Sequence, residues 1–256
     1  MPCSVTRFFT IILLGAVCCF ANKNLAFADS CYKVRAEHAK GDKADKKNTD
    51  LMIAAYKRAQ NDPAVHEKAT EGLVKSAYFA FRFVPFDKNK RKAKLDTLKN
   101  ISEAAYNRYP KNKEIAHIYA ASVSMWAAEK NPLAAIKDGL AAKVRDIAIS
   151  TENYQVLGRA HQLLPYIPII LSWPDKTLAE KYLKLALEQD PADTYNYYFL
   201  AEFRLDQKQY DEAQKLIDRG LSRGVRTDYM LEDKRGRWHL KELQKKLDKK
   251  HPRQAK

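Results

Sequence analysis

The sequence predicts an all-α protein built from helical hairpins that stack into a solenoid or bundle. Three observations support this fold class. Turn-forming residues are scarce, with eight glycines and ten prolines among 256 residues, which argues against an all-β fold. Apolar residues recur at helical rather than alternating spacing. A period of 34 residues appears in the C-terminal half, and such periods are typical of helical repeat proteins.

The N-terminus has the three parts of a secretory signal peptide. A short basic start ends at Arg7, an apolar run covers residues 8–21, and small residues, Ala26 and Ala28, stand at the −3 and −1 positions of a cleavage site. The apolar run is shorter than the roughly 20 residues that a membrane-spanning helix needs. We therefore expect residues 1–28 to be removed after Ala28 and the mature protein to be periplasmic.

All four cysteines lie within the first 31 residues, so no disulfide framework or cysteine-ligated zinc site organises the rest of the chain. After cleavage only Cys31 remains, either as a free thiol or in an intermolecular bridge. The residues before Cys18 and Cys19 match a lipoprotein acylation site poorly. Lipid anchoring of the mature chain therefore stays open.

Proline marks the boundaries between the expected helices, because it is tolerated in the first turn of a helix but not in its interior. The four boundary dipeptides are Asp62-Pro63, Tyr109-Pro110, Asn131-Pro132 and Asp190-Pro191. The polar, lysine-rich stretch 41–47 lies within a segment, 29–48, that we expect to be flexible, ahead of a helical domain at 49–227. The expected helices cover residues 31–40, 49–60, 63–83, 88–108, 112–130, 132–149, 151–164, 175–189, 193–206, 209–222 and 228–249.

Basic residues dominate the charge. The formal net charge is +15, with one cluster at residues 88–94 and another in residues 228–256, which are predicted to form a basic C-terminal helix and tail. These clusters are either solvated helix faces or surfaces that attract an acidic partner or an anionic membrane. An exported protein rarely meets nucleic acid, so we expect no nucleic-acid partner.

The 34-residue period is clearest after residue 178. The first copy consists of Ala179, Leu183, Ala186 and Pro191, and the second of Ala213, Ile217, Gly220 and Val225. Between the copies, Tyr197, Leu200 and Ala201 take the bulky, leucine and small positions of a first repeat helix. Helix packing dictates such a series of small and large residues, and this one is the pattern of a tetratricopeptide repeat.

An apolar insertion breaks the period upstream. Leu157-Gly158 resembles the next leucine–small pair, but it lies nine residues too far from Ala179. The additional residues fall within 163–174, which cannot continue as helix through three prolines. This loop either plugs the core of its own domain or lines a pocket or a protein interface. Its candidate ligand- or partner-binding residues are Tyr166, Ile167, Ile169, Ile170 and Trp173.

Aromatic residues crowd the expected helix over 193–206. Five of them are too many for a single core stripe, so either some face a groove or all belong to a thick helix–helix core. The candidate binding residues here are Tyr195 and Tyr198. The six histidines have no i, i+4 partner, and the chain has neither a glycine-rich phosphate loop nor a serine nucleophile elbow. We therefore expect no enzyme activity, no metal site and no cofactor.

The sequence resembles the TatT-type T-component proteins of tripartite periplasmic (TRAP) transporters. The resemblance rests on the export signal, the degenerate hairpins, the Leu157-Gly158-Arg159 helix with its Pro165-containing insertion, and the segments 179–191 and 197–202. The resemblance implies an all-α periplasmic protein with a central cavity or pore. It also implies docking onto a periplasmic solute-binding protein as an accessory component. A similar protein serves bacterial lipid trafficking, so the alternative is a carrier that holds a lipid or another hydrophobic small molecule in a helical cavity. A homo-oligomer stays open.

Overall fold

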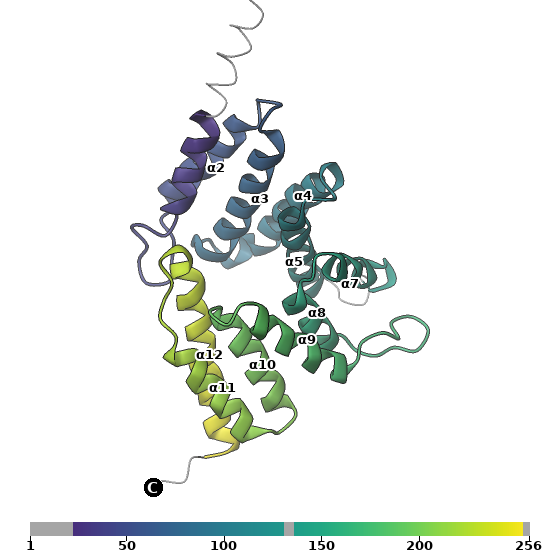
Figure 1. The fold of residues 1–256 in the computed structure, drawn as a ribbon. Helices are drawn as coiled ribbons and strands as arrows, with labels where there is room; N and C mark the ends of the chain where they lie inside the picture. Colours follow the sequence, from purple (N-terminus) through teal and green to yellow (C-terminus); the bar gives the residue numbers. More distant parts are fainter. Residues whose placement is uncertain (1–22, 131–135, 253–256) are drawn as a thin grey trace, which may run out of the picture. The chain divides into compact units, whose positions relative to one another are not determined.

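The computed structural model of the protein describes residues 23–130 and 136–252. Within them the chain forms helices joined by turns and loops, and the only β pairings are two isolated bridges (Figure 1). The predicted all-α fold class is confirmed. Residues 1–22 of the expected signal peptide lie outside the described residues.

The chain divides into two compact units, Met1–Ser122 and Val123–Lys256. The helices of the first unit are residues 23–33, α2 (Lys46–Ala59), α3 (His66–Phe83), the 3₁₀ helix η1 (Lys88–Lys90), α4 (Arg91–Arg108) and α5 (Lys113–Lys130), which continues into the second unit. The second unit also contains α7 (Leu140–Ser150), α8 (Tyr154–Leu163), α9 (Lys176–Gln189), α10 (Thr194–Asp206), α11 (Tyr210–Ser222), the 3₁₀ helix η2 (Thr227–Tyr229) and α12 (Met230–Lys250).

Helices α2 and α3 pair closely in the first unit, because Gly72 leaves room for the ring of Tyr56. The Tyr56 hydroxyl donates to the carboxylate of Asp29 at 2.7 Å, and the N–H of Ala44 donates to the carbonyl of Phe83 at 2.9 Å. The segment 29–48, expected to be flexible, therefore makes specific contacts with this hairpin. Ala28, at the expected cleavage site, lies within helical residues 23–33 and is fully buried.

Two of the expected helices differ from the structure. Residues 23–33 are helical and 34–38 form turns, so the helix expected over 31–40 is displaced toward the N-terminus. The helix expected over 132–149 is interrupted, because Gly139 adopts a left-handed conformation with φ of 73° and α7 begins after it. Residues 132–135 of that expected helix lie outside the described residues.

The predicted repeat positions form the core of the second unit. Helix α8 packs on α9, α10 packs on α11, and α12 packs on both α10 and α11. The core cluster includes Ala179, Leu183, Tyr197, Leu200, Ala201, Ala213 and Ile217, together with three leucines of α12, Leu240, Leu243 and Leu247. The basic C-terminal segment is therefore not a detachable tail, since α12 buries its leucines while its exposed face carries lysines.

Glycines mark the closest helix contacts in this core. A Cβ atom on Gly158 would lie 2.7 Å from the side chain of Leu183, and one on Gly220 would lie 2.8 Å from that of Tyr197. A Cβ atom on Gly236 of α12 would lie 2.1 Å from the hydroxyl oxygen of Thr194. Gly236 follows Ala201 by 35 residues, one more than the repeat period, so the close contact of α12 lies near the register of a first repeat helix.

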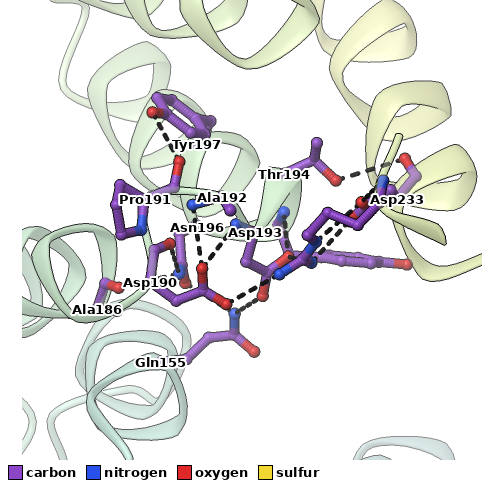
Figure 2. A network of polar contacts seen from close by, with 12 residues as sticks. Gln155, Ala186, Asp190, Pro191, Ala192, Asp193, Thr194, Asn196, Tyr197 and Asp233 are labelled. Carbon is purple, nitrogen blue, oxygen red and sulfur yellow. Dashed lines mark hydrogen bonds and ion pairs between the residues drawn. The ribbon is translucent and has the colours of Figure 1, made fainter. Parts of the chain in front are cut away.

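A polar network fixes the turn between α9 and α10 to the start of α12 (Figure 2). The guanidinium of Arg226 donates to both carboxylate oxygens of Asp233, at 2.7 and 2.9 Å, and to Asp190 at 3.1 Å. Asp233 is completely buried, and its hydrogen bonds raise the pKa of Arg226 above the usual range. The Asn196 side chain donates to the carbonyls of Ala186 and Asp190, which holds the end of α9. The network therefore sets the relative positions of α9, α10 and α12.

Candidate functional site

Helices α8 and α10 are the first helices of successive hairpins, α8–α9 and α10–α11, and α12 follows and packs on the second hairpin. Helix α10 contacts α8 on one side and α12 on the other. We call the surface that these three helices share the first-helix face. Some of its side chains, such as Tyr198 and Phe199, pack against the repeat core on one side, while Trp238 is exposed.

A ladder of polar pairs joins α8 to α10 across this face. The side-chain amide of Gln155 donates to the side-chain oxygen Oδ1 of Asn196 at 2.8 Å. One turn later the guanidinium of Arg159 pairs with the carboxylate of Glu202 at 2.5 Å. Near the end of α8, Gln162 donates to the carboxylate of Asp206 at 3.1 Å. The ladder makes the α8–α10 side of the face polar.

An aromatic cluster joins α10 to α12. Its members are Tyr195, Tyr198 and Phe199 on α10 and Trp238 and His239 on α12. The ring of His239 stacks on that of Tyr198, with centroids 4.9 Å apart, and the edge of Trp238 meets His239 at 4.8 Å. Trp238 remains 52% exposed, so it presents a large apolar surface to solvent.

Arg159 connects the ladder to the aromatic cluster. Its guanidinium carbon lies 4.5 Å from the ring centroid of Phe199, while the Tyr198 hydroxyl donates to Glu202 at 2.7 Å. Burial and the bond to Glu202 raise the pKa of Tyr198 above its usual range, so this hydroxyl stays protonated as a donor. Arg159 and Glu202 are thus held in one conformation by neighbours on two sides.

The structure brings two of the candidate residues together in the aromatic cluster. Tyr195 is buried and Tyr198 is half-buried, and their rings meet edge to face at 6.5 Å. Trp238, His239 and Arg159 were not predicted from the sequence to belong to this surface. The glycine at position 236 was the one signal that could have placed α12 beside α10.

The other five candidate residues lie on the insertion, which forms a short hairpin. Ile167 and Leu171 pair through two backbone hydrogen bonds of 2.9 and 2.7 Å, and the Ile170 N–H donates to the Pro168 carbonyl at 2.8 Å. Between them Ile169 adopts a left-handed conformation with φ of 68°, which is rare for a β-branched residue. We call residues 164–174 the apolar hairpin.

The apolar hairpin has a packed base and an exposed tip. At the base, Leu171 and Pro174 are buried and Trp173 is half-buried. At the tip, Tyr166 is 63%, Ile169 99% and Ile170 56% exposed. The sequence left open whether this loop plugs the core of its own domain or lines a pocket or a protein interface. The base packs on the domain, whereas the exposed tip is free to contact a partner.

His161 of α8 anchors the base. Its Nδ1 atom accepts the backbone N–H of Asp175 at 3.1 Å, and its ring meets the edge of Trp173 with centroids 5.0 Å apart. The guanidinium of Arg145 lies 5.3 Å from the Trp173 ring centroid. Burial lowers the pKa of His161 and Arg145 adds to this effect, while Asp175 opposes it.

The described residues hold no group of three or more His, Cys, Asp or Glu side chains placed to bind a metal ion. In the same part of the chain, no helix combines the length and the apolar character needed to cross a membrane.

The tetratricopeptide repeat family model matches residues 177–229, which cover α9 from its second residue onward and all of α10, α11 and η2. A search of the curated proteins returned no match to the chain. The second unit thus contains a tetratricopeptide-like repeat, a fold whose members are generally non-enzymatic scaffolds that bind other proteins through extended surfaces.

Proposed function

We infer that the chain is a non-catalytic, exported binding protein that docks through its first-helix face onto the solute-binding protein of a TRAP-type transporter. The tetratricopeptide match supports protein binding as the general role. The finer assignment rests on the resemblance to T-component proteins in the insertion and in the 179–202 region. Export rests on the signal-like N-terminus.

The observation that carries the proposal is the exposed Trp238 ring at the edge of the aromatic cluster. Through His239 and Tyr198 this cluster connects to the Arg159–Glu202 pair. Tryptophan, tyrosine and arginine supply most of the binding energy in protein interfaces, particularly where neighbours hold them in place. Here Trp238 packs on His239, and Arg159 is held between Glu202 and Phe199. Little side-chain freedom remains to be lost when a partner covers this surface.

The polar ladder also favours docking over the carrier alternative. A carrier of a lipid requires an apolar lining, whereas the α8–α10 boundary consists of amide, guanidinium and carboxylate groups. Polar groups arranged in pairs suit a wet protein interface, where each can exchange its partner for a group on the docking protein.

The test is an affinity measurement between the purified protein and each periplasmic solute-binding protein of the organism that encodes it. Trp238→Ala should weaken binding by roughly tenfold or more, because truncation of a hot-spot tryptophan typically costs about 2 kcal/mol or more. Leu51→Ala is the matched control, since Leu51 is 51% exposed on α2 and lies outside the face. Binding that survives Trp238→Ala unchanged would refute the proposed surface. A tightly held lipid in the native mass spectrum of the purified protein would support the carrier instead.

A further inference from the structure

The tip of the apolar hairpin is chemically unlike the rest of the surface. Residues 164–174 contain no charged side chain, in a protein of which 30% of residues are charged. Ile169 is almost completely exposed, and Tyr166 and Ile170 are exposed beside it. An apolar protrusion of this kind, held away from the core that its base packs on, normally marks a contact with another apolar phase.

Ile169 also occupies its position at the expense of backbone strain. Its φ of 68° lies in the left-handed region, where glycine is relaxed and a β-branched side chain is strained. A turn that served only to connect α8 to α9 would be more stable with glycine at this place. The strained isoleucine therefore indicates that the side chain itself is used.

Within residues 165–171 of the hairpin, most backbone N–H groups donate to carbonyls of the hairpin itself. A loop that stays in water does not need this, because water can accept these hydrogen bonds. Among residues 165–171, Pro165 and Pro168 have no N–H group to satisfy. Of the five that remain, Ile167, Ile170 and Leu171 donate their N–H groups to carbonyls within the hairpin. Entry into a lipid phase requires backbone groups to be paired internally, because hydrocarbon offers no hydrogen-bonding partner.

The charge of the protein suits a negatively charged surface. The formal net charge is +15, so the chain is attracted to an anionic bilayer before any specific contact forms. At the hairpin base the charges balance, with Arg145 beside Asp146 and Asp175 beside Lys176. No cluster of like charges at the base therefore opposes approach of the tip. Tyr166, which is exposed at the tip, is a residue type that favours the boundary between headgroups and acyl chains.

We propose that the apolar hairpin inserts Ile169 and Ile170 into the outer acyl region of an anionic lipid bilayer and so attaches the protein peripherally. Insertion is shallow, since the tip comprises only a few residues, and long-range attraction by the basic chain strengthens it. The proposal is independent of docking through the first-helix face, which lies on α8, α10 and α12.

The primary test places an environment-sensitive fluorophore on the tip. The probe is attached to Ile169→Cys in the mature chain, which begins at Asp29 and whose one native cysteine, Cys31, is replaced by serine. Vesicles of phosphatidylglycerol and phosphatidylethanolamine are then added. The proposal predicts a blue shift and quenching by lipids that carry a nitroxide on the acyl chain. The same fluorophore on Leu51→Cys, an exposed site on α2, should show neither effect, which controls for the affinity of the dye itself.

A flotation assay supplies the second measurement. The double variant Ile169→Ser/Ile170→Ser should partition into these vesicles on the order of tenfold less than the unaltered chain, because two apolar side chains no longer enter the bilayer. Leu51→Ser should partition like the unaltered chain. Binding should fall in high salt and on neutral phosphatidylcholine vesicles.

Three results would overturn the proposal. The first is vesicle binding without a change in the fluorescence of the label at 169, which would place the contact elsewhere on the chain. The second is a blue shift on addition of a solute-binding protein and none with vesicles, which would make the hairpin a protein-docking element. The third is an unaltered chain that stays unbound to the anionic vesicles.

Discussion

His161 holds the end of the apolar hairpin through its unprotonated Nδ1 atom, which accepts the backbone N–H of Asp175 at 3.1 Å. A protonated imidazole carries a proton on both nitrogens and cannot accept this bond. The anchor at the base of the hairpin is therefore sensitive to pH, and the sign of the effect follows from the lowered pKa of His161.

The first prediction is that the free energy of unfolding falls as the solution is acidified. The unfolded chain takes up a proton on this histidine near its ordinary pKa of about 6.5, before the folded chain does. The contribution of neutral His161 to the free energy of unfolding is thus complete above that pH. It is lost as the pH falls through the lower pKa of the folded state. Urea unfolding between about pH 7.5 and pH 5 measures it.

His161→Asn is the comparison variant for this experiment, because an amide oxygen can accept the Asp175 N–H and does not titrate. The pH dependence of the variant should be shallower than that of the unaltered protein. His117, whose pKa burial also lowers, remains in both proteins and cancels from the difference. Parallel curves for the two proteins would show that His161 is not the responsible group.

A second prediction concerns the contact between α8 and α9. Alanine normally stabilises a helix interior relative to glycine, by roughly 0.5–1 kcal/mol. In Gly158→Ala, however, the new Cβ atom would lie 2.7 Å from the Leu183 side chain and 2.9 Å from its backbone nitrogen. We expect a loss of about 1–3 kcal/mol by chemical denaturation, as for overpacked cores. Gly224→Ala, with open space around it, should be neutral or slightly stabilising, and equal stability of the two variants would contradict the close contact.

A third prediction concerns the turn network. Arg226→Ala leaves the buried carboxylate of Asp233 without its bidentate guanidinium partner. This should reduce the free energy of unfolding by about 3 kcal/mol. Arg223→Ala is the control from the same loop, since its partner is the hydroxyl of Tyr197 rather than a buried charge, and it should lose about 1 kcal/mol. Similar melting temperatures for the two variants would mean that the network contributes little.

The fourth prediction separates stability from function at the hairpin tip. Ile169→Gly should raise the free energy of unfolding by about 1 kcal/mol, because glycine relieves the left-handed conformation. Ile170→Gly, for which no such strain exists, should lower it by a similar amount. Both variants should bind anionic vesicles less well. A destabilised Ile169→Gly protein would show that the conformation of this residue is not strained.

The repeat core was the most predictable part of the fold. Ala179, Leu183, Tyr197 and Ile217 were recognised because helix packing imposes small and large residues at fixed positions, and all four are buried. The break at Gly139 was harder to foresee, because a single glycine within an apolar helical pattern does not reveal a left-handed conformation.

The candidate site was only partly accessible from sequence. The insertion could be located because three prolines interrupt an apolar run, but its division into a packed base and an exposed tip depends on tertiary contacts such as that between His161 and Trp173. Trp238 was missed because α12 reads as a basic helix, and its place beside Tyr198 follows only from how α12 packs on α10.

The most direct test of the proposed docking role is hydrogen–deuterium exchange of the protein with and without the solute-binding protein that it binds. The account predicts slower exchange in peptides from α8, α10 and α12, centred on Arg159, Tyr198 and Trp238, with α2 and α3 unchanged. Protection confined to α2 and α3, or none in α8, α10 and α12 while a complex is present, would contradict it.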